Sequence, residues 1–350
     1  MKTILLTGGG TAGHCIPHLA LIDELKKHFD KIYYIGSYNG MEKSIMKNAN
    51  IEYFAVSCAK LNRKFDINNF TIPFKLLKGI HQANKIIEKI KPNIIFSKGG
   101  YVAIPTIIAG KKHNIPVITH ESDFTIGLAN KLSSKYCKKV LTSFPETAKT
   151  VKNGEFVGSP LRQELLKTKK SESLKNLGLS GKKPVLLITG GSLGSVALNN
   201  CVRRSLPTLL EKFDVLHLCG KNNKSKINKQ GYIQKEFINN MYDAYSACDL
   251  CVSRAGSNTV FELIALKKPC ILIPLPKGVS RGDQVDNAEY FQKQGLVYVL
   301  PQNVLTDKSL VYAVNSVYSN RNKIFNKNKI DDYIANDKIV NILINYSLKD

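Results

Sequence analysis

The sequence predicts an α/β protein of two domains, each built on a parallel sheet with crossover helices. The chain has 350 residues, more than a single hydrophobic core usually serves. Short apolar runs alternate with amphipathic stretches from end to end, which is typical of parallel sheets. The pattern of strand, glycine turn and helix at residues 3–29 begins again at residues 184–200, so we expect two similar halves.

The order of the predicted elements follows from these runs. The first half predicts a strand at 3–7, a helix at 17–29 and further strands at 31–36, 93–100, 116–121 and 139–144. A charged stretch at 167–183 separates the halves, and the second half continues after 184–200 with strands at 214–220, 249–257, 269–275 and 295–300. Ligands of such sheets bind beyond the carboxyl ends of the strands, so we expect a site in a cleft between the halves.

Composition narrows the class of protein. The apolar share of 43% is ordinary for a globular chain, and no run approaches the roughly 18 uncharged apolar residues that span a bilayer. The first apolar run is too short for a signal peptide, so we expect a cytoplasmic protein. The eight cysteines are scattered, and the lone CxxC at Cys248 and Cys251 is interpreted as the start of a buried strand. Reduced thiols are therefore expected, and no metal site.

The net charge of +24 favours an anionic partner. The lysines are widely spread, and no RNA-binding, zinc-finger or basic-zipper pattern is present, which argues against nucleic acid. An anionic membrane surface is the better candidate. The plain alternative is a lysine-rich proteome that spreads charge without function.

The first glycine turn has the spacing of a dinucleotide fingerprint, G-x-G-x-x-G, at residues 8–13. That fingerprint requires an acidic residue at the end of the second strand to bind a ribose hydroxyl. Here the second strand ends at Gly36 and Ser37, and Glu42 comes several residues too late. The turn also lacks the Gly-Lys-Ser/Thr of a P-loop. We therefore favour a tight strand-to-helix turn that places His14 in a site.

Four other glycine-bearing turns follow predicted strands, at residues 97–105, 118–130, 189–195 and 253–266. Each would present backbone N–H groups at a helix N-terminus, where the helix dipole favours anions. In the last turn the strand ends at Arg254, Gly256 permits close approach and Ser257 can cap a helix. A diphosphate could lie on that N-terminus, while Glu262 accepts hydrogen bonds from two ribose hydroxyls.

Together these motifs resemble the MurG family of peptidoglycan N-acetylglucosaminyltransferases. The resemblance rests on GGGTAGH, KGGYVAIP, HES, GSPLR, GGSLGS, SRAGSNTVFE and RGDQVDNAE, which run in family order over about residues 4 to 300. It implies a GT-B fold of two Rossmann-like, doubly wound domains that face a central cleft. The domains are expected at 1–157 and 158–331, with a last helix at about 332–350 packing back on the first.

The resemblance also implies the reaction. GlcNAc would pass from UDP-GlcNAc to the C4 hydroxyl of the muramyl-pentapeptide sugar in undecaprenyl-linked lipid I, giving lipid II with inversion. No cofactor is implied. No D-x-D motif follows a strand, so we expect the charge of the diphosphate to be met by a helix N-terminus and Arg162.

Donor-binding residues carry over by position. The set is Thr11, Ala12, Gly13, Asp123, Arg162, Ser192, Ile238, Ser257, Asn258, Thr259, Val260, Phe261, Glu262 and Gln284. The resemblance implies that Glu262 holds the ribose, Ile238 contacts the uracil, and Ser192 with Arg162 meets the diphosphate. Two residues depart from the family pattern: Asp123 stands where asparagine is usual, and Leu193 where glutamine is common.

For the base that activates the acceptor hydroxyl we favour His14, because histidine titrates near neutrality and this one lies on the glycine turn. A histidine that merely packs on the turn is the structural alternative. His120 and Glu121 are the other candidates for catalysis. Tyr101 and Gly10 are expected to contact the acceptor.

A membrane-binding segment is expected at residues 70–91. Apolar side chains alternate there with lysines, an arrangement that peripheral proteins use on anionic lipid. The residues concerned are Phe70, Ile72, Phe74, Lys75, Leu77 and Lys78. The segment would hold the protein on the cytoplasmic face of the cell membrane, although an ordinary helix with its core face inward explains about half of these residues equally well.

Two alternatives remain open at this stage. One is another GT-B enzyme, such as a lipid glucosyltransferase or a sugar-nucleotide epimerase, which would share the nucleotide site and differ on the acceptor side. The other is a non-catalytic basic protein that binds membrane or nucleic acid and uses its glycine turns only as structure.

Overall fold

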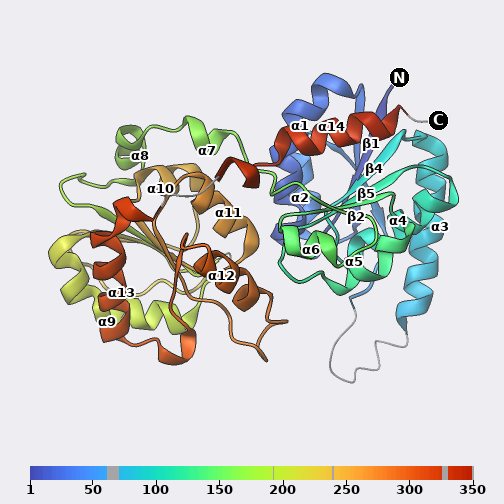
Figure 1. Ribbon diagram of the computed structural model, residues 1–350. Helices are drawn as coiled ribbons and strands as arrows, with labels where there is room; N and C mark the ends of the chain where they lie inside the picture. The colour runs from blue at the N-terminus through green and yellow to red at the C-terminus, as the bar shows by residue number, and fades with distance from the viewer. Residues whose placement is uncertain (61–70, 192, 239, 325–329, 349–350) are drawn as a thin grey trace. The chain divides into compact units, whose positions relative to one another are not determined.

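The computed structural model describes the chain except for residues 61–70, 192, 239, 325–329 and 349–350. The chain divides into two compact units, Met1–Arg162 with Asp332–Asp350, and Gln163–Asp331. Each unit is a parallel sheet covered by helices (Figure 1). The two-domain α/β prediction is confirmed.

The sheet of the first unit has seven parallel strands in the order β3-β2-β1-β4-β5-β6-β7. The strands are β1 Thr3–Thr7, β2 Lys31–Ser37, β3 Glu52–Val56, β4 Ile94–Ser97, β5 Val117–Glu121, β6 Lys139–Thr142 and β7 Gly154–Phe156. The helices are η1 Ala12–His14, α1 Ile16–His28, α2 Met41–Asn48, α3 Ile72–Ile90, η3 Tyr101–Ala103, α4 Ile104–Lys112, α5 Leu128–Ser133, η4 Ser134–Tyr136 and α6 Pro145–Lys149. Strands β1, β4 and β5 are buried along their whole length, as expected for a sheet with a core on each face.

The sheet of the second unit has six parallel strands in the order β10-β9-β8-β11-β12-β13. The strands are β8 Val185–Thr189, β9 Asp214–Leu218, β10 Tyr232–Lys235, β11 Leu250–Ser253, β12 Cys270–Leu272 and β13 Tyr298–Val299. The helices are α7 Glu164–Lys167, α8 Lys170–Leu177, α9 Val196–Lys212, α10 Met241–Ala247, α11 Ser257–Ala265, α12 Asp283–Lys293, η5 Gln302–Val304, α13 Asp307–Ser319 and η6 Arg321–Lys323. A further 3₁₀ helix, η7 Ile330–Tyr333, leads to α14 Asn336–Ser347.

Three strands escaped the sequence analysis: β3, β7 and β10. Each lies at the edge of its sheet, and none has the continuous buried run of a central strand. The strand predicted at 93–100 is also too long. It ends at Ser97 because Gly99 and Gly100 both have a left-handed backbone, with φ of 78° and 79°.

The last helix, α14, packs against α1 in the first unit (Figure 1). Ile339, Val340 and Leu343 join the core that contains Leu21 and Leu25 of α1. Residues 158–162, which we expected in the second domain, belong to the first unit. The reason is a set of hydrogen bonds from Asn336: its Oδ1 accepts from Leu161 N at 2.8 Å, and its Nδ2 donates to Leu161 O at 2.8 Å and to Ala20 O at 2.9 Å.

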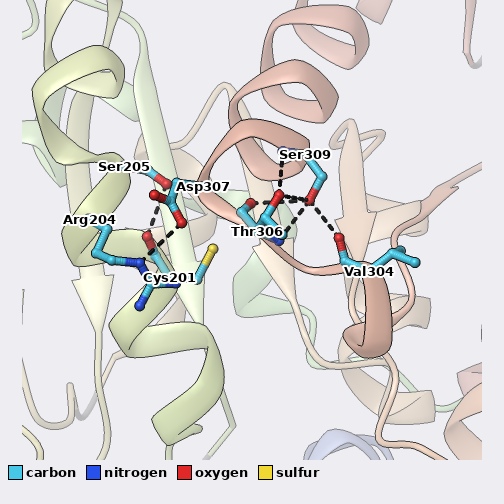
Figure 2. Close-up of polar contacts among 7 residues, drawn as sticks. All are labelled: Cys201, Arg204, Ser205, Val304, Thr306, Asp307 and Ser309. Atoms are coloured by element: carbon cyan, nitrogen blue, oxygen red, sulfur yellow. Dashed lines mark hydrogen bonds and ion pairs between the residues drawn. The ribbon is translucent and has the colours of Figure 1, made fainter.

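In the second unit, α13 begins at a capping box that Figure 2 shows. Thr306 Oγ1 accepts from Ser309 N at 3.1 Å, and Ser309 Oγ accepts from Thr306 N at 2.8 Å. Nearby, Arg204 of α9 forms an exposed ion pair with Asp307, 3.1 Å from Nε to Oδ1. These contacts fix where α13 starts beside α9.

All eight cysteines are free thiols, and all but Cys58 are buried. No helix in the described parts of the chain combines the length and apolar character needed to cross a bilayer.

Candidate active site

The glycine turn after β1 places His14 at the carboxyl edge of the first sheet. Gly10 has a φ of 86°, and a Cβ on it would lie 2.5 Å from Cε1 of Tyr101, so a side chain here would meet both strain and a clash. Half-buried His14 brings Nδ1 to 3.1 Å from Gly9 O and 3.1 Å from Thr11 Oγ1. A carbonyl oxygen only accepts, so Nδ1 carries the proton and the ring lone pair lies on Nε2.

The turn after β4 packs directly on this first turn. A Cβ on Gly100 would overlap Gly9 O and would lie 2.9 Å from His14 Nδ1. Tyr101 follows in η3 and is half-buried, and burial raises the pKa of its hydroxyl. His14, Gly10 and Tyr101 therefore come together, from segments about ninety residues apart in sequence.

His120, a predicted catalytic residue, is buried at the end of β5. Its Nε2 lies 2.9 Å from Gly158 O, and its Nδ1 lies 2.6 Å from Nζ of Lys98. Desolvation, followed by the charge of Lys98, holds the pKa of His120 well below its usual range. Both ring nitrogens are engaged and the ring is fully buried, so we favour His14 over His120 as the base.

Glu121, the other predicted catalytic residue, is also buried and hydrogen-bonded. Its Oε1 accepts from Asp123 N at 3.0 Å, and its Oε2 accepts from Gly127 N at 2.8 Å and Asn130 Nδ2 at 2.9 Å. This buried carboxylate closes the turn after β5 and so determines where half-buried Asp123 lies. Burial, together with the charge of Asp123, raises the pKa of Glu121.

The other donor residues predicted in the first unit lie on two segments. Thr11 is exposed, and Ala12 and Gly13 in η1 are half-buried on the turn that carries His14. Arg162 is half-buried and ends the first of the two segments that form the first unit.

In the second unit the turn after β8 leads into α9, whose N-cap is Ser195. Ser195 Oγ accepts from Leu198 N at 3.3 Å and from Nη2 of Arg254 at 2.6 Å. Arg254 is itself buried, donating also to Gln302 Oε1 at 2.6 Å and Ile273 O at 2.9 Å. The sequence analysis placed Arg254 only at a strand end. Through these bonds Arg254 connects the segment after β8 to the segment after β12 at the carboxyl edge of the second sheet.

Ser192 of the same turn lies outside the described residues. Its neighbour Leu193 is exposed, and Gly191 and Gly194 have left-handed φ values of 82° and 75°. The backbone turn that the family pattern requires is therefore present with leucine in place of glutamine.

Helix α11 carries the predicted ribose-binding residues. Ser257 and Glu262 are 7% and 8% exposed and lie in the first two turns of the helix. Asn258 and Thr259 are half-buried. Val260 and Phe261 are core residues, and the Phe261 ring lies 5.2 Å from that of Phe291. For these two residues we therefore expect donor contact through the backbone N–H groups.

The remaining two donor predictions, Ile238 and Gln284, lie on two other segments of the second unit. Ile238 is half-buried in the segment between β10 and α10. Gln284, in the first turn of α12, accepts from Leu275 N at 3.1 Å through Oε1, which anchors the segment after β12.

Comparison with known proteins identifies the family. Residues 4–142 match the glycosyltransferase family 28 N-terminal domain, and residues 185–340 match its C-terminal domain. A UDP-N-acetylglucosamine--N-acetylmuramyl-(pentapeptide) pyrophosphoryl-undecaprenol N-acetylglucosamine transferase of Clostridium botulinum (strain Loch Maree / Type A3) is 50% identical over 96% of this chain and 97% of the relative. The enzyme of the same name from Clostridium tetani is 47% identical over 99% of this chain and 98% of its own length.

Solved structures agree. The crystal structure of Acinetobacter baumannii MurG matches with a TM-score of 0.72 at 25% identity, over 98% of this chain and 99% of that one. A UDP-GlcNAc 2-epimerase from Neisseria meningitidis matches with a TM-score of 0.68 at 14% identity over the whole of both chains, which shows the shared fold alone. The chain belongs to glycosyltransferase family 28, as an N-acetylglucosamine transferase of the kind found in its clostridial relatives.

Proposed function

We propose that this protein transfers GlcNAc from UDP-GlcNAc to the muramyl-pentapeptide that is linked through pyrophosphate to undecaprenol. The observation that carries the proposal is the identity of 50% over 96% of the chain to a relative named for that reaction. The placement of His14, Gly10 and Tyr101 at one edge of the first sheet supports it, because an acceptor hydroxyl needs a base there.

His14 acts as that base in the proposed mechanism. Its Nε2 takes the proton of the C4 hydroxyl of the muramyl sugar as the oxygen forms a bond to C1 of GlcNAc. The hydroxyl oxygen attacks C1 on the face opposite the diphosphate, which gives inversion at C1. The bond from C1 to the phosphate oxygen breaks, and its electron pair leaves with UDP. A base positioned in this way contributes about 10²–10⁴-fold to the rate.

The second unit holds the donor. Glu262 accepts hydrogen bonds from the ribose hydroxyls, while N–H groups at the start of α11 stabilise the charge that develops on the diphosphate. Arg162 is the diphosphate contact that we assign to the first unit. Gln284 and Ile238 complete the donor contacts. Arg254 has a supporting role, because its guanidinium already donates to Ser195, Gln302 and the Ile273 carbonyl.

The direct test is UDP release by the purified protein. We expect release with UDP-GlcNAc only when a lipid-linked muramyl-pentapeptide is present, and a much slower reaction with UDP-glucose. We also expect UDP-GlcNAc to raise the melting temperature, and NADH and oligonucleotides not to. Conversion of UDP-GlcNAc to a 2-epimer without acceptor would contradict the transferase proposal in favour of the epimerase alternative.

We further propose that the start of α3 binds the cytoplasmic face of an anionic membrane. Phe74 and Leu77 are 75% and 65% exposed, and Lys75 and Lys78 are exposed beside them. The same helix uses Gly79, Ala83 and Ile87 to pack on its unit, so these first turns are not needed for the core. Ile72 is half-buried, and Phe70 lies outside the described residues.

Vesicle flotation tests this surface. Replacing Phe74 and Leu77 with serine should lower binding to phosphatidylglycerol vesicles by about tenfold, because two large apolar side chains no longer enter the interface. Tyr312→Ser removes an exposed aromatic side chain from the second unit and is the matched control. Equal binding of the parent to phosphatidylcholine vesicles would contradict the part assigned to charge.

A further inference from the structure

A buried carboxylate lies behind the turn that carries His14, and the mechanism above does not use it. Glu42 of α2 is completely buried. Its Oε1 accepts from Ser37 N at 3.0 Å and from Ser37 Oγ at 2.5 Å. Its Oε2 is also buried, and among the described residues no group donates a hydrogen bond to it. A carboxylate oxygen left in this state is costly, so its retention calls for a compensating role.

Glycines make room for this carboxylate on three sides. A Cβ on Gly9 would lie 2.7 Å from Oε1 of Glu42, one on Gly36 would lie 2.8 Å from its Cγ, and one on Gly40 would overlap the carboxylate. Gly9 is also the residue whose carbonyl oxygen lies 3.1 Å from His14 Nδ1. The backbone of Gly9 is therefore sandwiched between the Glu42 carboxylate and the His14 ring.

The other titratable groups around this turn are nearly all uncharged at neutral pH. Burial and then the charge of Glu42 raise the pKa of Cys15 to about 12 and that of Cys58 to about 11. Burial is the first cause, and the Glu42 charge a further one, of the raised pKa values of Tyr34, Tyr53 and Tyr101. Burial, with the charge of Lys98 second, lowers the pKa of His18 to about 3.

Lys98 is the cation of this set. Burial lowers its pKa to about 7, against the opposing charges of Glu121 and Asp123, and its Nζ lies 2.6 Å from His120 Nδ1 and 2.7 Å from Ser122 Oγ. Lys98 thus faces the turn after β5, whereas Glu42 faces the turn after β1. The negative charge placed against the Gly9 backbone comes from Glu42.

We propose that Glu42 is a positioning residue for the transfer reaction: its buried carboxylate braces the Gly9 turn and stabilises the imidazolium that His14 becomes when it takes the acceptor's proton. The inference rests on the proposed role of His14 as base. In that step the positive charge develops on the ring, and a carboxylate in a poorly solvated site favours the charged form. The same charge makes the neutral ring a stronger base.

Glu42→Gln tests this role, because glutamine keeps the shape and the acceptor oxygen for Ser37 but removes the charge. Without the carboxylate the pKa of His14 falls. The acidic limb of kcat/KM for the acceptor should therefore move to lower pH by about one unit, and kcat on the plateau should fall about tenfold. The KM for UDP-GlcNAc should not change. An NMR titration of the His14 ring, assigned by its absence in His14→Ala, should show the same fall in pKa without any turnover.

Asp214→Asn is the matched control. Asp214 is also a buried carboxylate that accepts from a serine hydroxyl, 2.8 Å from Ser180 Oγ, but it lies at the amino end of β9 in the second unit. The Asp214→Asn variant should be less stable than the parent protein and should keep the parent pH profile of kcat/KM. Glu42→Asp, which retains a carboxylate, should recover part of the pH profile if Glu42→Gln folds poorly.

The outcomes separate this inference from the proposed function. An unchanged His14 pKa in Glu42→Gln overturns the inference, as does an equal loss of kcat in the parent and His14→Ala backgrounds. Full turnover by His14→Ala instead overturns the assignment of the base, and the NMR titration still reports whether Glu42 acts on the ring.

Discussion

The two units share the order of their first six strands, to which the first unit adds a seventh, but the residues at the carboxyl edge of the two sheets differ. In each, the first strand of the unit lies near the centre, a glycine turn follows it, and a long helix covers it. The turn of the first unit lies between two ionisable groups, His14 on one side and the buried Glu42 on the other. The turn of the second unit meets a hydrogen-bond network around Arg254 and Ser195. The two sheets provide similar turns, and the proposed division between proton transfer in the first unit and donor binding in the second depends on the different residues around each turn.

His14→Ala should produce the largest effect, because it removes the one group on the first turn that we assign to proton transfer. We expect kcat to fall by about 10²–10⁴-fold, the usual value of a positioned base. UDP release with saturating acceptor measures this. Stabilisation by UDP-GlcNAc should persist, since the donor is assigned mainly to the second unit. A variant that keeps most of its turnover would erase the chemical difference between the two turns.

Glu262→Gln should weaken the binding of UDP-GlcNAc and leave proton transfer unchanged. The carboxylate is assigned to two ribose hydroxyls, and hydrogen bonds to a charged group contribute about 1.5–3 kcal/mol each. The KM for UDP-GlcNAc should rise by about a hundredfold, while kcat at saturating donor changes little. Uridine diphosphate binding, measured by calorimetry, should weaken equally. A large fall in kcat with an unchanged KM would mean that Glu262 belongs to the chemistry.

Much of the fold could be predicted because central parallel strands are buried on both faces and read as continuous apolar runs, as in β1 and β8. The edge strands β3, β7 and β10 could not be predicted in this way, because they are only partly buried. The boundary at residue 162 depends on Asn336, whose partner Leu161 lies 175 residues away along the chain.

Contacts between side chains of the candidate site could likewise not be predicted from local sequence. The motif around His120 and Glu121 marked the right turn, but nothing local in sequence shows that His120 lies beside Gly158 or that Glu121 accepts three hydrogen bonds. Glu42 was set aside as too late in sequence to bind a ribose. In the folded chain it returns to the end of β2, through Ser37, and reaches the first glycine turn from behind.

Asn336→Ala tests how much the hydrogen bonds at the start of α14 contribute to the stability of the first unit. The amide makes three hydrogen bonds, and its loss leaves the buried N–H and C=O of Leu161 without these partners. We expect the free energy of unfolding to fall by about 2 kcal/mol, measured by urea denaturation. Asn315→Ala, at an exposed hydrogen bond of α13 in the second unit, is the control and should cost little. Equal losses in the two variants would contradict the role given to Asn336.

Thr306→Ala should have the smallest effect and act on the second unit alone. Thr306 is the N-cap of α13, and its Oγ1 accepts from Ser309 N at 3.1 Å (Figure 2). Removing a threonine N-cap costs about 1 kcal/mol, because one of the first N–H groups of the helix loses its partner. Thr306→Ser keeps the hydroxyl and should retain most of the stability. Neither variant should alter the pH profile, because the capping box belongs to the second unit and the ionisable turn to the first. A shift of that profile would show that the two units do not divide the chemistry as proposed.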